Sequence, residues 1–529
     1  MHIALHILLF SKGIKTSQVN SYTFKRPLVI GISDFNKVST CSNFSIVLPL
    51  LPLLGYIYCN SISGLNTFKD LKMGQSLEEP SKKKERLFFF TVAFTFLIGT
   101  ALVYSMRFNG PPIRSDGMGY YAYLPAMFIY EDLGMDKYVA AYASYYGIEK
   151  PTYFLGLKKQ ENSSNYLDKY PIGVAVMMTP FFLVAHGITL AIQAIAPEIK
   201  ADGFSSPFYH YIIAFGSTLY LFLGLILLKK ILNPYFRQKT IYITLIALLF
   251  ATNLFHYGTY DSVFSHAYSF FLFAAFILLT QKWFERPSYK TALFLGLVTG
   301  LIVLVRPTNI LVVMFFLCYN FRLTEFKSFA MDQVSLFWKH RGNLMLLLMV
   351  SALMVSLQLL YWRAITGHWI VFSYEGEYFD FQNPQLLNVL FSVHKGLFFW
   401  APLLLCIVPG FYFMRERKEL HSFLIPLIAY FALTVYLIAS WWCWSYGGSY
   451  GHRGFIESFV VLAFPMAAFY EKVMDITCVL LRRIIWLVSF ACIVFNLYLM
   501  FQYWRGFIPF DNTTIEIFNA AVRNKDMVK

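Results

Sequence analysis

The sequence has few charged residues. Asp, Glu, Lys and Arg make up 14% of its 529 residues, whereas a soluble globular chain contains about 25%. Hydrophobic residues make up 57% of the chain, and its mean hydropathy is +0.54. This composition excludes a soluble enzyme, a disordered chain and a small disulfide scaffold. It predicts an all-α, polytopic membrane protein built as a helical bundle.

Cysteine is also scarce, and its pattern is not that of a metal or disulfide site. There are seven Cys and no CxxC pair. Most lie within apolar runs, namely Cys318, Cys406, Cys478 and Cys492. This placement favours packed thiols. The sequence therefore indicates no metal and no other cofactor, although a divalent ion remains an alternative.

Apolar runs long enough to cross a bilayer recur along the chain. A hydrocarbon core of about 30 Å needs roughly 20 apolar residues per helix. Runs of this kind predict about eleven transmembrane helices, at 87–106, 208–228, 240–257, 262–281, 291–305, 308–321, 343–364, 396–414, 421–441, 455–470 and 484–503.

Acidic residues are outnumbered by basic ones, 29 against 44, giving a formal charge of +15. The loops explain most of this excess. If successive spans cross the membrane in alternating directions, the loops on the inner side hold 21 Lys and Arg against 10 Asp and Glu. The outer loop 107–170 holds seven residues of each sign. Basic inside loops set membrane orientation. The charge therefore requires no nucleic-acid partner.

One apolar run does not fit this alternation. Residues 171–195 are followed by Pro197, Glu198 and Asp202 and not by a basic cluster. We therefore interpret this run as a helix, or a pair of helices, lying at the outer interface. The interpretation leaves one large external region, 107–206, that carries interfacial helices.

The first 72 residues differ from the remainder. They are rich in Ser, Asn and Lys, and Met73 leads directly into the basic cluster before the first span. We expect 1–72 to be a weakly packed extension with Met73 as an alternative start, and 73–529 to form the membrane domain. A signal-like segment is the competing interpretation.

Two polar clusters lie in the predicted outer loop. The first runs from Arg114 through Asp116 to Tyr120 and Tyr121, with an N-cap for a helix at 119–130 as the alternative role for Asp116. The second contains Lys169, which could bind an anion as a point charge or be an ordinary snorkelling lysine.

Two more clusters follow in later outer turns. Asp261 and His266 could position a substrate or tune a base, and the alternative is a capping Asp beside a packed His. The segment 366–395 holds Glu375 and Glu377 and is typical of a lid or acceptor loop. Solvated loop charges are the competing interpretation for both glutamates.

The fifth cluster runs from Trp441 to Arg453 and contains a Gly-rich segment with Gly447, Gly448, Ser449 and Gly451. Interfacial tryptophans are common in membrane proteins. They do not explain a Gly-rich bend that ends in His452-Arg453 just before a span. An arginine beside free backbone amides suits a phosphate.

The order of these clusters resembles that of the GT-C-fold glycosyltransferases, which take a sugar from a polyprenyl-phosphate carrier. Examples are the protein mannosyltransferases and the lipid A aminoarabinose transferase. Asp116 matches the acidic residue after the first span of that family, and Asp261 matches the second acidic residue. The segment 168–173 is similar to a Lys/His-Pro-Pro-like segment, with Tyr170 where the first Pro is usual. The run ending in Arg453 looks like a late Gly-Arg segment.

The resemblance covers roughly 87–460 and implies an inverting transfer of sugar from a polyprenyl-phosphate donor to a hydroxyl acceptor. For this transfer we expect Asp116 to be the base and Asp261 to be a second catalytic residue that, with His266, orients acceptor or donor. The implied phosphate ligands are Lys169, Arg453 and Arg114. The implied substrate-binding residues are His266, Tyr120, Tyr121, Glu375 and His452.

Other functions fit the same composition. A lipid-linked sugar or polysaccharide transporter, a glycan polymerase and an accessory subunit without catalysis are the alternatives. Transporters place their sites near the midplane and often contain repeats; here the charges gather on one face and no repeat is evident. We expect an integral protein of a bacterial inner membrane, with membrane lipids around it, a glycan, lipid or protein acceptor, and its site facing the periplasm.

Overall fold

The computed structural model describes residues 82–105, 110–149, 155–161, 163–321 and 326–525. Seven of its helices are long and apolar enough to cross a membrane, which supports the prediction of an all-α membrane protein. They are α3 (Lys82–Ser105), α7 (Gly173–Gln193), α8 (Pro207–Leu232), α11 (Ser265–Glu285), α15 (Arg341–Thr366), α19 (His421–Ala439) and α21 (Val479–Trp504). The predictions for residues 1–72 and for Met73 lie outside the described residues.

Some of the eleven predicted spans coincide with long helices and others with shorter ones. Apart from α7, each of the seven long helices coincides with a predicted span. The remaining predicted spans coincide with shorter elements, so the structure does not establish a count of eleven. These are α9 (Gln238–Phe250), α12 (Tyr289–Val305), η4 with α13 (Pro307–Val312 and Val313–Leu317), η6 with α18 (Pro402–Cys406 and Ile407–Arg415) and α20 (Phe459–Met474). Proline within or before several of them interrupts the helical hydrogen bonding.

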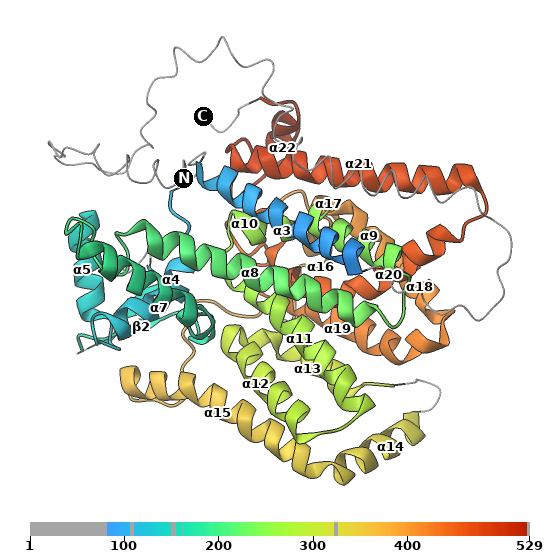
Figure 1. Ribbon diagram of the computed structural model, residues 1–529, viewed down its shortest axis with the longest axis horizontal. Helices are drawn as coiled ribbons and strands as arrows, with labels where there is room; N and C mark the ends of the chain where they lie inside the picture. Colours follow the sequence, from blue (N-terminus) through green and yellow to red (C-terminus); the bar gives the residue numbers. More distant parts are fainter. Residues whose placement is uncertain (1–81, 106–109, 150–154, 162, 322–325, 526–529) are drawn as a thin grey trace. The chain divides into compact units, whose positions relative to one another are not determined.

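The predicted outer region forms one assembly. It contains α4 (Asp116–Phe128), α5 (Asp136–Tyr146) and a two-stranded antiparallel hairpin of β1 (Leu157–Lys159) and β2 (Tyr166–Asp168), with Lys158 opposite Leu167. These elements and α7 gather at one end of α8, on the left of Figure 1. The hairpin was not predicted from sequence, because its strands have only three residues each.

Residues 171–195, predicted to form a helix or a pair of helices, fall mainly in the single helix α7. This helix packs antiparallel along α8, with the Tyr220 hydroxyl donating to the Met177 carbonyl and His186 hydrogen-bonded to Tyr209. Its length and hydropathy are those of a membrane span. A position of this helix at the outer interface therefore stays a prediction, and its packing along α8 was not visible in the loop charges.

Close helix contacts in the bundle depend on small residues. Gly296 and Gly300, one turn apart on α12, face α15, where an added Cβ would lie 2.6 Å from the Leu347 carbonyl oxygen and 2.5 Å from Met354. Ser351 of α15 donates to the Gly296 carbonyl at 2.9 Å. Paired small residues allow such close approach of membrane helices.

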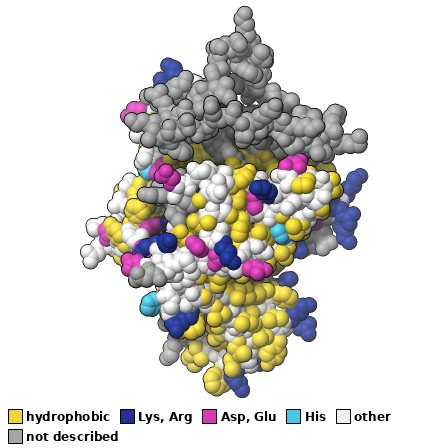
Figure 2. All heavy atoms as spheres, turned by 90° about the vertical axis from the view of Figure 1, so that its left-hand side faces the viewer, with side chains coloured by type: hydrophobic (Ala, Val, Ile, Leu, Met, Phe, Trp, Pro, Cys, Tyr) yellow, Lys and Arg dark blue, Asp and Glu magenta, His cyan; other side chains and the backbone are white. Residues whose placement is uncertain are grey.

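The opposite side of α15 is a broad apolar surface. Its exposed side chains are Met345, Leu348, Met349, Leu353, Leu357 and Leu360. Figure 2 shows hydrophobic side chains across the lower part of the molecule, at the height of α12 and α15 in Figure 1, and mixed charges above them. An apolar helix face of this size suits a lipid environment.

The remaining described elements are short connections. They are α10 (Leu254–Thr259), α14 (Phe326–Lys339), α16 (Leu386–Phe391), α17 (Leu397–Trp400), η7 (Lys418–Leu420), η8 (Arg453–Phe455) and α22 (Ile515–Val522). The first residues of α4, the α10–α11 connection and η8 supply the charges described next.

Candidate active site

Three part-buried arginine–carboxylate pairs join segments that are far apart in the sequence. Arg453 contacts Asp116 at 2.6 Å, Arg114 contacts Asp261 at 2.9 Å and Arg306 contacts Glu457 at 3.2 Å. Buried charges are tolerated when they are paired and hydrogen-bonded. We call these six residues the charge cluster.

The first pair joins the first turn of α4 to η8. Asp116 Oδ2 accepts from Arg453, and Tyr170 donates to Oδ1 at 3.1 Å. Burial alone would raise the pKa of Asp116, but the Arg453 guanidinium and Tyr170 lower it below its usual value. Asp116 is thus an ionised hydrogen-bond acceptor and not the predicted alternative, a helix N-cap.

Backbone strain occurs on both sides of this pair. Ser115, directly before Asp116, has φ +48°, and Tyr446 has φ +60°. The Tyr446 carbonyl accepts two bonds from Arg453, at 3.0 Å and 2.6 Å. Non-glycine residues adopt such conformations rarely, and they cluster at functional sites. The two positive-φ residues therefore lie directly beside the charged partners, one before Asp116 and one at the carbonyl that binds Arg453.

The second pair includes a histidine that the sequence analysis did not assign. Asp261 Oδ2 bonds to His256 Nε2 at 2.9 Å, while Trp504 donates its indole N–H to His256 Nδ1. Because Nδ1 accepts, a neutral His256 carries its proton on Nε2 and donates it to Asp261. Burial opposes the ionisation of Asp261, but Arg114 and His256 outweigh it and lower its pKa.

Asp261 and His266, which the sequence analysis considered together, have different partners, and a capping role for Asp261 is wrong. The helix α11 begins at Ser265 after Phe264, and His266 Nδ1 lies 3.3 Å from Glu457. One helical turn of sequence separates Asp261 from His266, but the α10–α11 bend directs them to different partners.

Sequence reasoning missed the third pair entirely. Arg306 follows α12 directly before Pro307, and Glu457 lies between η8 and α20. Their side chains are 17% and 5% exposed. A charge inside or beside an apolar run is itself a signal of function. Both residues carry that signal, but neither belongs to a recognisable polar cluster.

The outer lysines differ in their surroundings. Lys169 pairs with Glu377 and lies 4.9 Å from the centre of the Tyr374 ring. It contributes to lowering the pKa of Asp116, so it lies near the charge cluster. Glu377 has a side chain 17% exposed, which contradicts its interpretation as a solvated loop charge.

Glu375 lies outside the cluster. It pairs with Lys158 of β1, and both side chains are more than half exposed. The predicted substrate-binding role of Glu375 is therefore not supported, whereas the competing interpretation of a solvated charge is. The two glutamates differ because Glu377 is turned toward Lys169 and Glu375 toward the hairpin.

The two predicted tyrosines, Tyr120 and Tyr121, lie in different surroundings. Tyr120 is buried and its ring centre lies 4.7 Å from that of Tyr170, beside the Asp116 pair. Tyr121, one residue later on α4, donates to the Gly203 carbonyl at 2.7 Å. Consecutive helical residues point about 100° apart. Tyr121 therefore secures the α7–α8 connection and does not face the cluster.

Two buried bases lie near Arg453. His452 packs against Phe455, and burial lowers its pKa to about 3. Lys395 is 1% exposed and donates to the carbonyls of Ser449 and Phe510. Burial, with the charge of Arg453, lowers the pKa of Lys395 to about 7, against the opposing effect of Asp511. These bonds secure the Gly-rich segment that precedes Arg453.

In the described part of the chain, no group of three or more His, Cys, Asp or Glu side chains is placed to hold a metal ion. Comparison with protein-family models, curated proteins and solved structures finds no match to this chain. The site is therefore interpreted from its own chemistry. It offers ionised carboxylates that can accept protons and arginines that can bind a phosphate.

Proposed function

We propose that this protein is a membrane glycosyltransferase. It moves a sugar from a polyprenyl-phosphate donor to an acceptor hydroxyl at the outer, periplasmic face of an inner membrane. The single observation that carries the proposal is the 2.6 Å contact between Asp116 and Arg453, which lie 337 positions apart. Such a transfer needs a base and a phosphate ligand close together.

Asp116 is the preferred base among the three acids. Its side chain is 24% exposed, whereas those of Asp261 and Glu457 are 9% and 5% exposed. Asp261 and Glu457 each bind an arginine and a histidine. Asp116 is therefore the carboxylate that an acceptor hydroxyl reaches most readily. Asp261 holds Arg114 and His256 in place and acts as a positioning residue.

The reaction is a single displacement. The acceptor oxygen forms a bond to the anomeric carbon as the bond from that carbon to the phosphate oxygen breaks. The hydroxyl proton passes to Asp116, and the bonding electron pair leaves with the prenyl phosphate. Attack from the side opposite the leaving group inverts the anomeric configuration.

The Asp116–Arg453 pair couples donor binding to base strength. A donor phosphate competes with Asp116 for the Arg453 guanidinium. When Arg453 turns to the phosphate, Asp116 loses the main group that lowers its pKa, while burial still raises it. The carboxylate becomes a stronger base only after the donor is bound. Lys169 and Arg306 supply further positive charge for the departing phosphate.

The test compares two carboxyl-to-amide substitutions in the full chain, reconstituted in liposomes. A panel of prenyl-phosphate sugars serves as donor, and released prenyl phosphate is measured. We expect Asp116→Asn to lower the transfer rate by at least about 100-fold, the usual range for a general base. Glu375→Gln is the matched control and should transfer normally.

Near-normal transfer by a folded Asp116→Asn protein would remove Asp116 as the base. A second outcome concerns the transporter alternative. If wild-type protein moves lipid-linked sugar across the liposome membrane without releasing prenyl phosphate, transport replaces transfer as the function. Release of prenyl phosphate with growth of a glycan chain identifies a polymerase, which uses the same displacement.

A further inference from the structure

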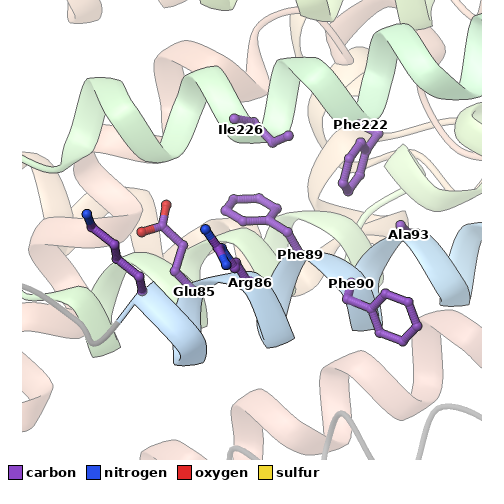
Figure 3. Close-up of a pocket in the computed structure, with 8 residues that line it drawn as sticks. Glu85, Arg86, Phe89, Phe90, Ala93, Phe222 and Ile226 are labelled. Carbon is purple, nitrogen blue, oxygen red and sulfur yellow. The ribbon is translucent and has the colours of Figure 1, made fainter.

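A groove lies between α3 and α8 at the Lys82 end of α3, away from the charge cluster. It measures about 490 Å³ and is lined by Lys82, Glu85, Arg86, Phe89, Phe90, Ala93, Phe222 and Ile226. Figure 3 shows Glu85, Arg86 and Phe89 turned from α3 toward α8, where Phe222 and Ile226 face them. The lining therefore changes from charged to apolar along a single helix.

The charged end carries an excess of positive charge. Lys229 of α8 pairs with Glu85 at 2.8 Å and neutralises the one acidic residue of the lining. Within the described part of the chain, neither Lys82 nor Arg86 forms an ion pair, and both are exposed. Two cations thus remain available to an anion at this end of the groove.

The apolar end suits a hydrocarbon chain. Phe89 and Phe222 meet edge to face across it, with their ring centres 6.0 Å apart. Phe90 is 68% exposed on the same helix. An occupant that matches both ends has an anionic head and an apolar tail. This end of α3 is also the one that the loop charges place on the inner side of the membrane.

We propose that this groove binds an anionic phospholipid of the inner leaflet. Its phosphate lies between Lys82 and Arg86, and an acyl chain runs along Phe89 toward Phe222. Basic clusters beside a membrane helix recognise anionic lipids, and each Lys or Arg near the surface strengthens binding by about 1 kcal/mol. Because one kcal/mol corresponds to about fivefold, two cations correspond to about thirtyfold.

The test uses a phosphatidylglycerol that carries a photoreactive acyl chain, added to the full chain in phosphatidylcholine nanodiscs. We expect crosslinks on the peptides that contain Phe89 and Phe222, and competition by unlabelled phosphatidylglycerol but not by phosphatidylcholine. The double variant Lys82→Gln/Arg86→Gln should label about thirtyfold more weakly at these peptides. High salt should weaken the labelling of the wild type.

The control removes two cations elsewhere on the same predicted face. Arg286→Gln/Lys290→Gln has the same change of charge but does not alter the groove lining, and it should label like the wild type. Equal loss in both double variants would show a general surface attraction and overturn the site. Equal competition by phosphatidylcholine, or stronger competition by a prenyl phosphate, would overturn the proposed occupant. Unchanged size-exclusion profiles verify that the variants fold.

Discussion

The Asp116–Arg453 and Lys158–Glu375 ion pairs both connect parts of the chain that lie more than 200 positions apart, but they differ in their consequences. Asp116 and Arg453 have side chains 24% and 13% exposed, whereas Lys158 and Glu375 are 58% and 54% exposed. Water screens the exposed pair, and its net value is about 0–1 kcal/mol. Removing one member of a buried pair leaves an uncompensated charge and costs about 3–5 kcal/mol. Burial, and not separation in sequence, therefore distinguishes a site from a surface contact.

The largest effect is expected from breaking the buried pair on one side. Arg453→Met leaves Asp116 without its main counter-charge and should cost about 3–5 kcal/mol in unfolding free energy. The double variant Asp116→Asn/Arg453→Met should recover most of that loss, because both charges are removed. Thermal unfolding of the purified proteins measures this coupling.

The rate of sugar transfer by the same two variants distinguishes a structural role of the ion pair from a catalytic one. Both variants should be inactive, because Arg453→Met lacks the phosphate ligand and the restabilised double variant lacks the base as well. Transfer by the double variant would show that the pair only supports the fold. A double variant as unstable as Arg453→Met would show that the two side chains are not coupled.

An intermediate effect is expected at Asp168, a buried acid with no basic partner among the described residues. Its side chain is fully buried, Oδ1 accepts from the Tyr170 amide and Oδ2 has no partner among the described residues. Burial raises its pKa well above 3.8. The folded state therefore binds more protons than the unfolded state above that value, and stability falls as pH rises.

Asp168→Asn removes this dependence. The variant should gain stability over the wild type as pH rises from 4, by at most about 1.4 kcal/mol per pH unit. Unfolding midpoints of both proteins between pH 4 and pH 8 provide the measurement. Parallel curves for the two proteins would mean that Asp168 ionises normally in the folded state.

The smallest effect is expected at the exposed pair. Lys158→Met and Glu375→Gln should each change the unfolding free energy by less than about 1 kcal/mol, and their coupling should decrease in high salt. Sugar transfer should be unaffected. A coupling as large as that of Asp116 with Arg453 would contradict the distinction by burial.

Part of the site was predictable from sequence. Asp116, Asp261, Lys169 and Arg453 all flank apolar runs at the face predicted to be outside, so their membership of one polar region follows from topology. Arg306 and Glu457 lie beside or within apolar runs, which is itself a signal of function, but neither belongs to a polar cluster that would indicate its partner. Their pairing depends on how α12 and α20 pack.

The fold also has features that were predictable from sequence and features that were not. Long helices such as α8 and α21 coincide with predicted spans because length and hydropathy are local properties. The packing of α7 along α8 and the β1–β2 hairpin were not predicted. Both depend on contacts with partners elsewhere in the chain, which flanking charge and short strand patterns do not encode.

The sequence by itself determined that this is an all-α membrane protein and where most of its helices lie. It also placed the polar clusters at their ends, because apolar run length and loop charge act residue by residue. Only the tertiary structure decided the partners: Asp261 with His256, Lys169 with Glu377 and Asp116 with Arg453. A charge brought out of water requires a counter-charge at hydrogen-bond distance, and that distance is set by helix packing across hundreds of residues.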